Sequence, residues 1–195
     1  MLSFSVSNNG LQDIRALAKC TQLEYLCLDF TGITTIPPEV FSSMKSLTVL
    51  SAQWNQLTAL PDTIGSLSSI QQLNFCNNKL TTIPTTIKHL AATIQLLSCL
   101  YTHQMSALSF HNRSRLTYQR TVSYNSLATV PQEVFQLSHL QILRLSHNEL
   151  TELPSDLSGL SDIGILSCLH HCTQTFVRNT TTNLTFVPSQ CHRTI

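Results

Sequence analysis

Six side chains near the C-terminus are of the types that bind zinc: Cys168, His170, His171, Cys172, Cys191 and His192. Structural zinc sites usually combine two spaced pairs, such as C-x2–4-C with H-x3–5-H. Here three residues separate Cys168 from Cys172, but Cys191 and His192 are adjacent. This spacing does not favour a metal site, and we expect no metal and no other cofactor.

Motifs of known catalytic sites do not occur in the sequence. There is no Gly-rich phosphate loop, no G-x-S-x-G and no H-E-x-x-H, and the five glycines are scattered. We therefore expect a protein that is not an enzyme.

The chain is nearly neutral and poor in charged residues. Its formal net charge is +1, and Asp, Glu, Lys and Arg make up 11% of the residues, against about 25% in typical soluble proteins. This balance does not favour nucleic acid or an anionic membrane as a partner. The N-terminal residues lack the basic start and apolar run of a signal peptide, and no apolar stretch is long enough to span a membrane. We expect a soluble, cytoplasmic protein whose seven cysteines are reduced thiols.

An internal repeat dominates the sequence. It is clearest in "LTVLSAQWNQLTALPDTIGSL" (Leu47–Leu67), "IQQLNFCNNKLTTIPTTIKHL" (Ile70–Leu90) and "LQILRLSHNELTELPSDLSGL" (Leu140–Leu160). With the first residue of each unit as offset 0, apolar residues stand at offsets 0, 3, 5, 10, 13, 17 and 20, Asn at offset 8 and Pro at offset 14. Units starting at Met1, Leu23 and Thr117 follow the pattern less completely. The asparagines at offset 8, which we call the Asn ladder, are Asn9, Asn55, Asn78, Asn125 and Asn148.

This pattern, LxxLxLxxNxLxxLPxxIxxL, resembles the leucine-rich repeat. The 23-residue form with Leu-Pro is similar to the intracellular Ras-group class, represented by Ras suppressor, Scribble and Erbin. The first unit, with 22 residues and no Pro, is more similar to repeats of a regulatory subunit of protein phosphatase 1.

The residue pattern itself predicts the fold. The L-x-L core is typical of a short strand whose alternate side chains point to opposite faces, and the I-x-x-L end has helical spacing. One unit cannot bury its apolar face alone, so the units must stack. We expect an α/β solenoid, a leucine-rich-repeat arc with a parallel β-sheet on the concave face and short helical or irregular segments on the convex face. The Asn ladder is expected to satisfy backbone groups of the turns that follow the strands.

Offsets 2, 4, 6 and 7 are expected to project from the concave sheet. Offset 7 carries a row rich in aromatic side chains, which we call the edge row: Phe30, Trp54, Asn77, Tyr124 and His147. Exposed aromatics flanked by polar groups are typical anchors of protein interfaces, although at this offset they also commonly shield the turn. The predicted partner-binding residues are Tyr25, Asp29, Phe30, Gln53, Trp54, Gln72, Asn74, Asn77, Tyr124, Arg144 and His147. Among them, Asp29 and Arg144 are candidates for setting the polarity of the partner.

Two stretches depart from the repeat. Residues 1–90 hold four units and residues 121–163 hold two, whereas residues 91–120 and the degenerate tail 164–195 abandon the pattern and contain no Asp, Glu or Lys. Ile163, Leu166 and Cys168 begin a further repeat, which the rest of the tail does not continue. Both stretches contain a similar run, "LSCLYTHQ" in the first and "LSCLHHCTQ" in the second. If the 23-residue step from Ile70 continues, the next unit starts at Thr93, and only Leu96 and Phe110 then suit their core positions. Three explanations fit this first stretch: a decayed repeat in phase with the others, a looped-out insertion, or translated non-coding sequence such as a retained intron.

Together these features predict a non-enzymatic module or scaffold that binds another protein on its concave face. The resemblance to Ras-group repeats implies a place in signalling assemblies with a small GTPase or a signalling enzyme. The alternatives are a regulatory or targeting subunit of an enzyme such as a protein phosphatase, or a fragment of an immune-type receptor.

Overall fold

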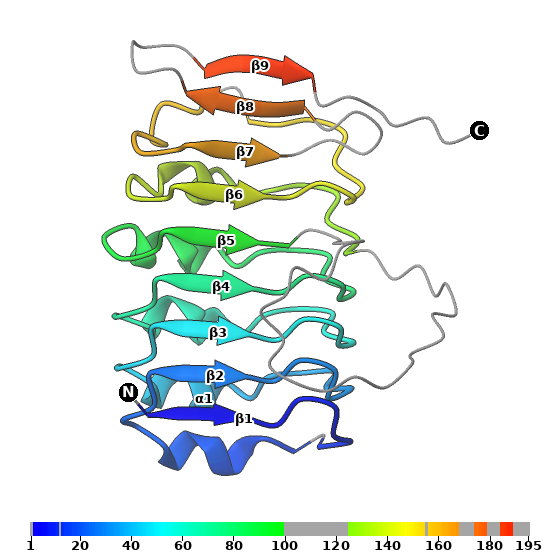
Figure 1. The fold of residues 1–195 in the computed structure, drawn as a ribbon, viewed down its shortest axis with the longest axis vertical. Helices are drawn as coiled ribbons and strands as arrows, with labels where there is room; N and C mark the ends of the chain where they lie inside the picture. Colours follow the sequence, from blue (N-terminus) through cyan, green and yellow to red (C-terminus); the bar gives the residue numbers. More distant parts are fainter. Residues whose placement is uncertain are drawn as a thin grey trace, which may run out of the picture.

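A single sheet runs through the molecule (Figure 1). The structure is a computed structural model, and it describes residues 2–11, 13–99, 125–154, 156–167, 174–178 and 184–188. The strands in these residues are β1 (Ser3–Ser5), β2 (Tyr25–Cys27), β3 (Val49–Ser51), β4 (Gln72–Asn74), β5 (Leu96–Ser98), β6 (Ile142–Arg144), β7 (Ile165–Ser167), β8 (Gln174–Arg178) and β9 (Leu184–Pro188). They lie side by side in sequence order. Strands β1 to β7 pair parallel, whereas β8 and β9 pair antiparallel beyond β7.

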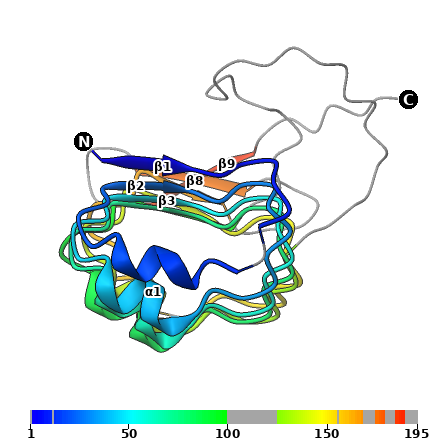
Figure 2. The same cartoon turned by 90° about the horizontal axis from the view of Figure 1, so that it is seen from below.

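Short helices cover one side of the sheet (Figure 2). They are η1 (Arg15–Lys19), α1 (Pro38–Ser43), η2 (Asp62–Ser66), η3 (Thr85–Leu90) and η4 (Gln132–Gln136). All but η1 begin directly after a proline with extended backbone, and the η helices are 3-10 helices. The fixed φ of proline suits a chain that turns sharply into a helix, and its carbonyl accepts the first helical bond, as from the Ile64 N–H to Pro61 at 3.0 Å.

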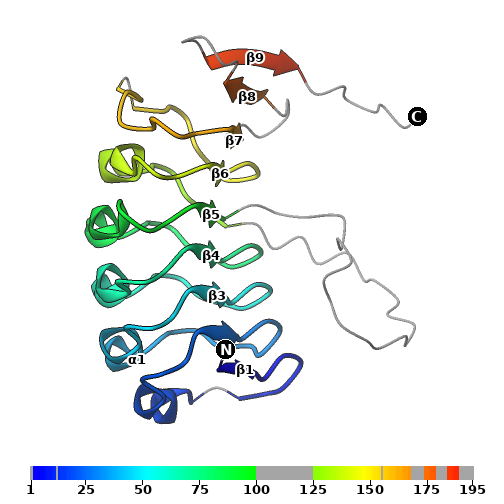
Figure 3. The same ribbon diagram turned by 60° about the vertical axis from the view of Figure 1, so that its left-hand side comes forward.

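The core lies between the strands and the helices, and the repeats stack along it like coils (Figure 3). One row of residues at offset 3 occupies equivalent positions on the seven parallel strands: Phe4, Leu26, Leu50, Leu73, Leu97, Leu143 and Leu166. All of these leucines are buried, and Phe41, Phe75 and Phe135 fill the wider part of the core. Since burying one such side chain stabilises a fold by about 1.5–3 kcal/mol, each repeat depends on its neighbours. The predicted α/β solenoid with a parallel sheet and short convex helices is therefore confirmed. In the described residues, no helix has the length and apolar character needed to cross a membrane.

The first irregular stretch begins later in the structure than the sequence predicts. Strand β5 pairs in register with both β4 and β6, so this unit begins at Ile94 rather than at Thr93. Leu96, which the predicted register placed in the core, lies on the opposite face, and Leu97 takes the core position. Residues 94–99 thus follow the repeat, although the sequence indicated that 91–120 does not.

The same unit is completed by Asn125. Its Nδ2 donates to the carbonyl of Cys99 at 3.1 Å, as Nδ2 of Asn78 donates to Phe75 at 3.0 Å. In the regular unit these partners are three residues apart, but Cys99 and Asn125 are 26 apart. The chain therefore carries 23 residues more than a regular unit between this strand and its turn. The three explanations of this stretch (a decayed repeat, a looped-out insertion and translated non-coding sequence) remain predictions, because residues 100–124 lie outside the described residues. The predicted start at Thr117 lies outside the described residues.

The C-terminal boundary also differs from the prediction. Strand β7 pairs with β6 in the same parallel register as the earlier strands. The repeat pattern therefore continues to residue 167, as the repeat start predicted at Ile163 and Leu166 indicates, although the predicted tail was given as 164–195.

Candidate protein-binding surface

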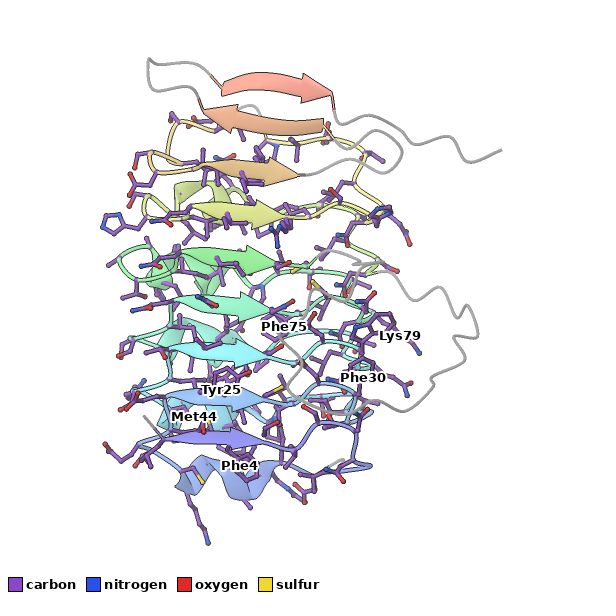
Figure 4. The ribbon with its side chains drawn as sticks, in the orientation of Figure 1. Phe4, Tyr25, Phe30, Met44, Phe75 and Lys79 are labelled. Carbon is purple, nitrogen blue, oxygen red and sulfur yellow. The ribbon has the colours of Figure 1, made fainter. Side chains whose placement is uncertain are left out.

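The concave face is the face of the sheet that points away from the helices (Figure 2). Figure 4 shows two of the predicted residues in place, Tyr25 on β2 and Phe30 in the turn that follows this strand. The described residues at offsets 2, 4 and 6 are Ser3, Ser5, Ser7, Tyr25, Cys27, Asp29, Val49, Ser51, Gln53, Gln72, Asn74, Cys76, Leu96, Ser98, Ile142, Arg144, Ser146, Ile165 and Ser167. Only Asp29 and Arg144 among them carry a full charge. The face is therefore mainly a mixture of small polar and apolar groups.

The Asn ladder fixes the turns at the edge of this face. Asn78 is fully buried, and its Oδ1 accepts a bond from the Leu57 N–H of the preceding repeat at 3.1 Å. Its Nδ2 donates to the carbonyls of Ala52 at 2.9 Å and Phe75 at 3.0 Å. Each such amide therefore joins two successive repeats as well as the turn of its own repeat.

The other members of the ladder repeat this arrangement, with two differences. Asn55, Asn125 and Asn148 are buried and bond to the preceding repeat. In the second unit Thr31 replaces Asn, and its hydroxyl donates to the Leu28 carbonyl at 2.9 Å. Asn9 is exposed, and within the described part of the chain its side chain bonds only in its own repeat, to the carbonyls of Val6 and Ser7. The predicted ladder is thus present, but Asn9 does not join two repeats.

In the described residues, the residue before each ladder position, and before Thr31 in the second unit, has a left-handed backbone. Asn8, Phe30, Trp54, Asn77 and His147 have φ between 56° and 60°. This region costs an L-residue roughly 1–2 kcal/mol, and a residue other than glycine remains there only where the surrounding structure holds it. Here the hydrogen bonds made by the next residue hold the turn, so the described residues of the edge row have a fixed backbone before any partner binds.

The first aromatic pair of the edge row is stacked. The ring centroids of Phe30 and Trp54 lie 5.4 Å apart with an angle of 8° between the planes. Phe30 is 42% exposed, and Trp54 is half-buried. The two rings come from successive repeats and stack on each other beside the sheet. Of the remaining edge row, His147 is half-buried, Asn77 is buried, and Tyr124 lies outside the described residues.

Asp29 is bonded within the protein rather than free for a partner. Its Oδ1 accepts bonds from the Ser51 hydroxyl at 2.7 Å and the Gln53 N–H at 2.8 Å. The Gln53 Nε2 adds bonds to Asp29 Oδ2 at 3.4 Å and to Ser51 Oγ at 3.1 Å. The predicted role of Asp29 in setting partner polarity is therefore weakened, because its carboxylate and the Gln53 amide already bond to each other.

Several other predicted contacts are also occupied or covered. Asn74 Oδ1 accepts from the Cys76 N–H at 3.2 Å, which leaves its amide nitrogen for other bonds. Asn77 is 1% exposed, and among the described residues neither polar atom of its side chain has a hydrogen-bond partner. A side chain buried in this way does not fit the predicted direct contact with a partner. By contrast, Gln72 is exposed at the centre of the sheet, as predicted.

Tyr25 presents a neutral phenol to this face. It is half-buried on β2. Burial, together with neighbouring Cys27 and the charge of Asp29, raises the pKa of Tyr25 above its usual value. The phenol therefore keeps its proton at neutral pH and can donate a hydrogen bond to a partner.

The described cysteines are free thiols. Cys27, Cys76 and Cys99 are buried and Cys20 is exposed, and the reduced state of the seven cysteines remains a prediction. The described residues contain no group of three or more His, Cys, Asp or Glu side chains that could hold a metal ion. The six zinc-type residues near the C-terminus lie outside this part of the chain.

Comparison with protein families gives the repeat its name. A family model described as leucine rich repeat matches residues 121–167, and another with the same description matches residues 69–90. The chain carries leucine-rich repeats. Keratocan of Danio rerio is 33% identical over 146 residues, which are 73% of this chain and 42% of keratocan. The chain therefore spans less than half the length of this curated relative. None of these matches tests the intracellular Ras-group class, which remains a prediction.

Solved structures of leucine-rich-repeat proteins share the fold. A leucine-rich-repeat protein of Leptospira interrogans superposes with a TM-score of 0.59 at 24% identity and covers 88% of this chain and 43% of its own. An internalin of Listeria monocytogenes superposes with a TM-score of 0.56 at 20% identity, over 87% of this chain and 47% of its own.

A third structure is the ectodomain of the Arabidopsis thaliana membrane receptor kinase GASSHO1/SCHENGEN3, in complex with CASPARIAN STRIP INTEGRITY FACTOR 2. Its TM-score is 0.59 at 27% identity, and the match covers 80% of this chain and 16% of that one.

One feature of the concave face was missed by sequence reasoning. Leu96, Ile142 and Ile165 stand opposite one another on β5, β6 and β7 at offset 2, and all three are half-buried. The one-residue error in the predicted start of the fifth unit placed Leu96 in the core. With the unit started at Ile94, the sequence alone identifies this aliphatic row.

Proposed function

We propose that this chain is a non-enzymatic leucine-rich-repeat module that binds another protein on its concave face. The observation that carries the proposal is the stacked pair Phe30–Trp54, held by left-handed turns beside a face almost free of charge. Large, rigid aromatic surfaces bordered by polar groups are typical of interface anchors. Because the ladder fixes the backbone before binding, little conformational entropy is lost when a partner docks. The Arabidopsis receptor ectodomain, solved in complex with another molecule, supports a binding role for repeats of this kind.

A site-specific crosslinking experiment tests where the partner binds. A photoreactive benzoylphenylalanine replaces the exposed Gln72 on the concave face, and in a matched chain it replaces the exposed Lys88 on η3, on the convex face. We expect a discrete protein adduct from position 72 in lysate of the source cells and none from position 88. The double variant Phe30→Ala/Trp54→Ala, once shown to be folded, should reduce the adduct at position 72. Adducts only from position 88, or none from position 72, would contradict the proposal.

The cellular setting is a separate part of the proposal. We propose a cytoplasmic signalling scaffold, with a small GTPase or a signalling enzyme as the partner, on the basis of the Leu-Pro repeats that resemble the Ras-group class. The Arabidopsis receptor ectodomain favours the alternative that the chain is part of a receptor. Surface biotinylation of intact cells that express the full-length gene separates the two, since only a receptor portion outside the cell is labelled.

A further inference from the structure

We infer that the partner presents an acidic side chain flanked by aliphatic ones, and that Arg144 with the aliphatic row Leu96, Ile142 and Ile165 receives it. This inference deepens the proposed function and rests on it. It starts from the two charged side chains of the concave face, of which only one is available.

Arg144 is an uncompensated cation. It is half-buried on β6, and in the described part of the chain its guanidinium makes no hydrogen bond and no ion pair. Its neighbours in register are Ser98 on β5 and Ser167 on β7, which carry no charge. Asp29 lies four strands away, or roughly 19 Å at about 4.8 Å per strand. That separation exceeds the Debye length of about 8 Å at physiological ionic strength, so Asp29 does not neutralise Arg144.

The aliphatic row lies directly beside this charge. Ile142 is two residues before Arg144 on the same strand, so the two side chains share one face of the sheet. Leu96 and Ile165 stand opposite Ile142 on the two adjacent strands. Three half-buried aliphatic side chains thus lie next to one unpaired guanidinium at the C-terminal half of the concave face.

Arg144 and the aliphatic row together form a patch whose chemistry determines which partner segment fits it. A guanidinium binds a carboxylate with two parallel hydrogen bonds, and a partly desolvated cation favours an opposite charge more than an exposed one does. Binding is also favoured when apolar side chains of the partner cover the aliphatic row, because apolar surface of both proteins is then removed from water. A lysine or arginine of a partner at the same place would meet an unpaired like charge, which is unfavourable. The patch therefore fits a protein segment with Asp or Glu beside Leu, Ile or Val.

Selection from a phage-displayed library of random dodecapeptides tests this inference with the full chain. We expect peptides enriched in Asp or Glu next to aliphatic residues. Against the variant Arg144→Glu, the selected peptides should instead contain Lys or Arg. The best wild-type peptide should bind Arg144→Gln about tenfold more weakly, which corresponds to about 1.4 kcal/mol. Arg144→Lys should recover part of that loss, because it keeps the charge but not the forked geometry. Lys88→Gln, the same change of charge on the convex face, should leave binding unchanged.

Crosslinking separates failure of this inference from failure of the proposed function. Gln72 is the strand neighbour of Leu96, so a photoreactive group at position 72 borders the patch. If peptides crosslink to position 72 but show no acidic preference, or bind Arg144→Gln as well as the wild type, the inference is overturned and concave binding stands. If no peptide is selected, or none crosslinks to position 72, the concave-face proposal fails and this inference fails with it.

Discussion

Asn125 and Cys99 are 26 residues apart in sequence, yet Nδ2 of Asn125 donates a 3.1 Å hydrogen bond to the carbonyl of Cys99 within a single repeat. The bond has the geometry of the one from Asn148 to Leu145, whose partners are three residues apart. The register of the solenoid is thus continuous from β5 to β6, regardless of the chain between residues 99 and 125.

Deletion of residues 100–122 is therefore expected to leave a regular repeat. It joins Cys99 to Ser123 and restores the spacing of three residues between the strand and Asn125. Because the cost of closing a loop rises by about 0.6 kcal/mol per doubling of its length, the shortened chain should be more stable by about 2 kcal/mol. Urea denaturation followed by circular dichroism measures the change.

Deletion of residues 100–123 is the matched control. It removes one residue more and leaves a single residue between Cys99 and Asn125, too few for the turn of a regular unit. This variant should be less stable than the 100–122 deletion. A 100–122 deletion that loses cooperative unfolding would show that the intervening residues contribute to the fold.

Asn78→Ala should strongly destabilise the solenoid. It leaves the Leu57 N–H and the carbonyls of Ala52 and Phe75 without their partner in a fully buried site. Leaving such groups unsatisfied costs about 1–3 kcal/mol. Asn9→Ala is the control, because Asn9 is exposed, and its effect should stay within about 0.5 kcal/mol. Equal losses for the two variants in chemical denaturation would argue against a ladder that joins the repeats.

The repeat pattern predicts the fold because each of its elements has a physical cause that recurs. Leu73 is buried for the same reason as Leu50 and Leu26, and an error at one unit does not change the assignment of the others. The boundary predicted at 91 depends instead on the exact length of a single unit. The unit that starts at Ile70 is one residue longer than 23, since the next begins at Ile94. A shift of one residue exchanges the two faces of a strand, which is why Leu96 was assigned to the wrong face.

The candidate surface was harder to predict than the fold. The sequence places Asp29 and Arg144 on the same face, but it does not show which charge is available. That depends on whether a side chain of the next repeat reaches it, as Ser51 and Gln53 reach Asp29. Whether a charged side chain is free to bind a partner therefore depends on how the repeats pack, whereas its position on a strand follows from the sequence repeat.

At position 54 a glycine variant should be more stable than an alanine variant, which is the reverse of the usual order of stability. Trp54 has φ of 56°, a region that glycine adopts without the cost paid by other residues. Trp54→Ala and Trp54→Gly both lose the stack with Phe30, but only the glycine variant relieves the backbone. We expect Trp54→Gly to be more stable than Trp54→Ala by about 1 kcal/mol in thermal or urea unfolding.

Gln72 provides the comparison at an ordinary strand position. There Gln72→Ala should be more stable than Gln72→Gly by about 0.5–1 kcal/mol, because glycine loses more backbone entropy on folding. If the alanine variant is more stable than the glycine variant at both positions, the left-handed turn at Trp54 carries little strain.

The Cys99 thiol should resist alkylation in the folded protein. It is 1% exposed, and burial raises its pKa well above the usual range, so the reactive thiolate does not form at neutral pH. Because the folded-state pKa is the higher one, the stabilising contribution is full below the unfolded pKa of about 8.5 and is lost as the pH rises above it. Iodoacetamide labelling near pH 8 with peptide mass mapping should modify the exposed Cys20 and leave Cys99 unmodified until urea is added. Labelling of Cys99 at the rate of Cys20 in the native protein would mean that the strand-to-turn junction at Cys99 opens, and that the bond from Asn125 does not close this repeat.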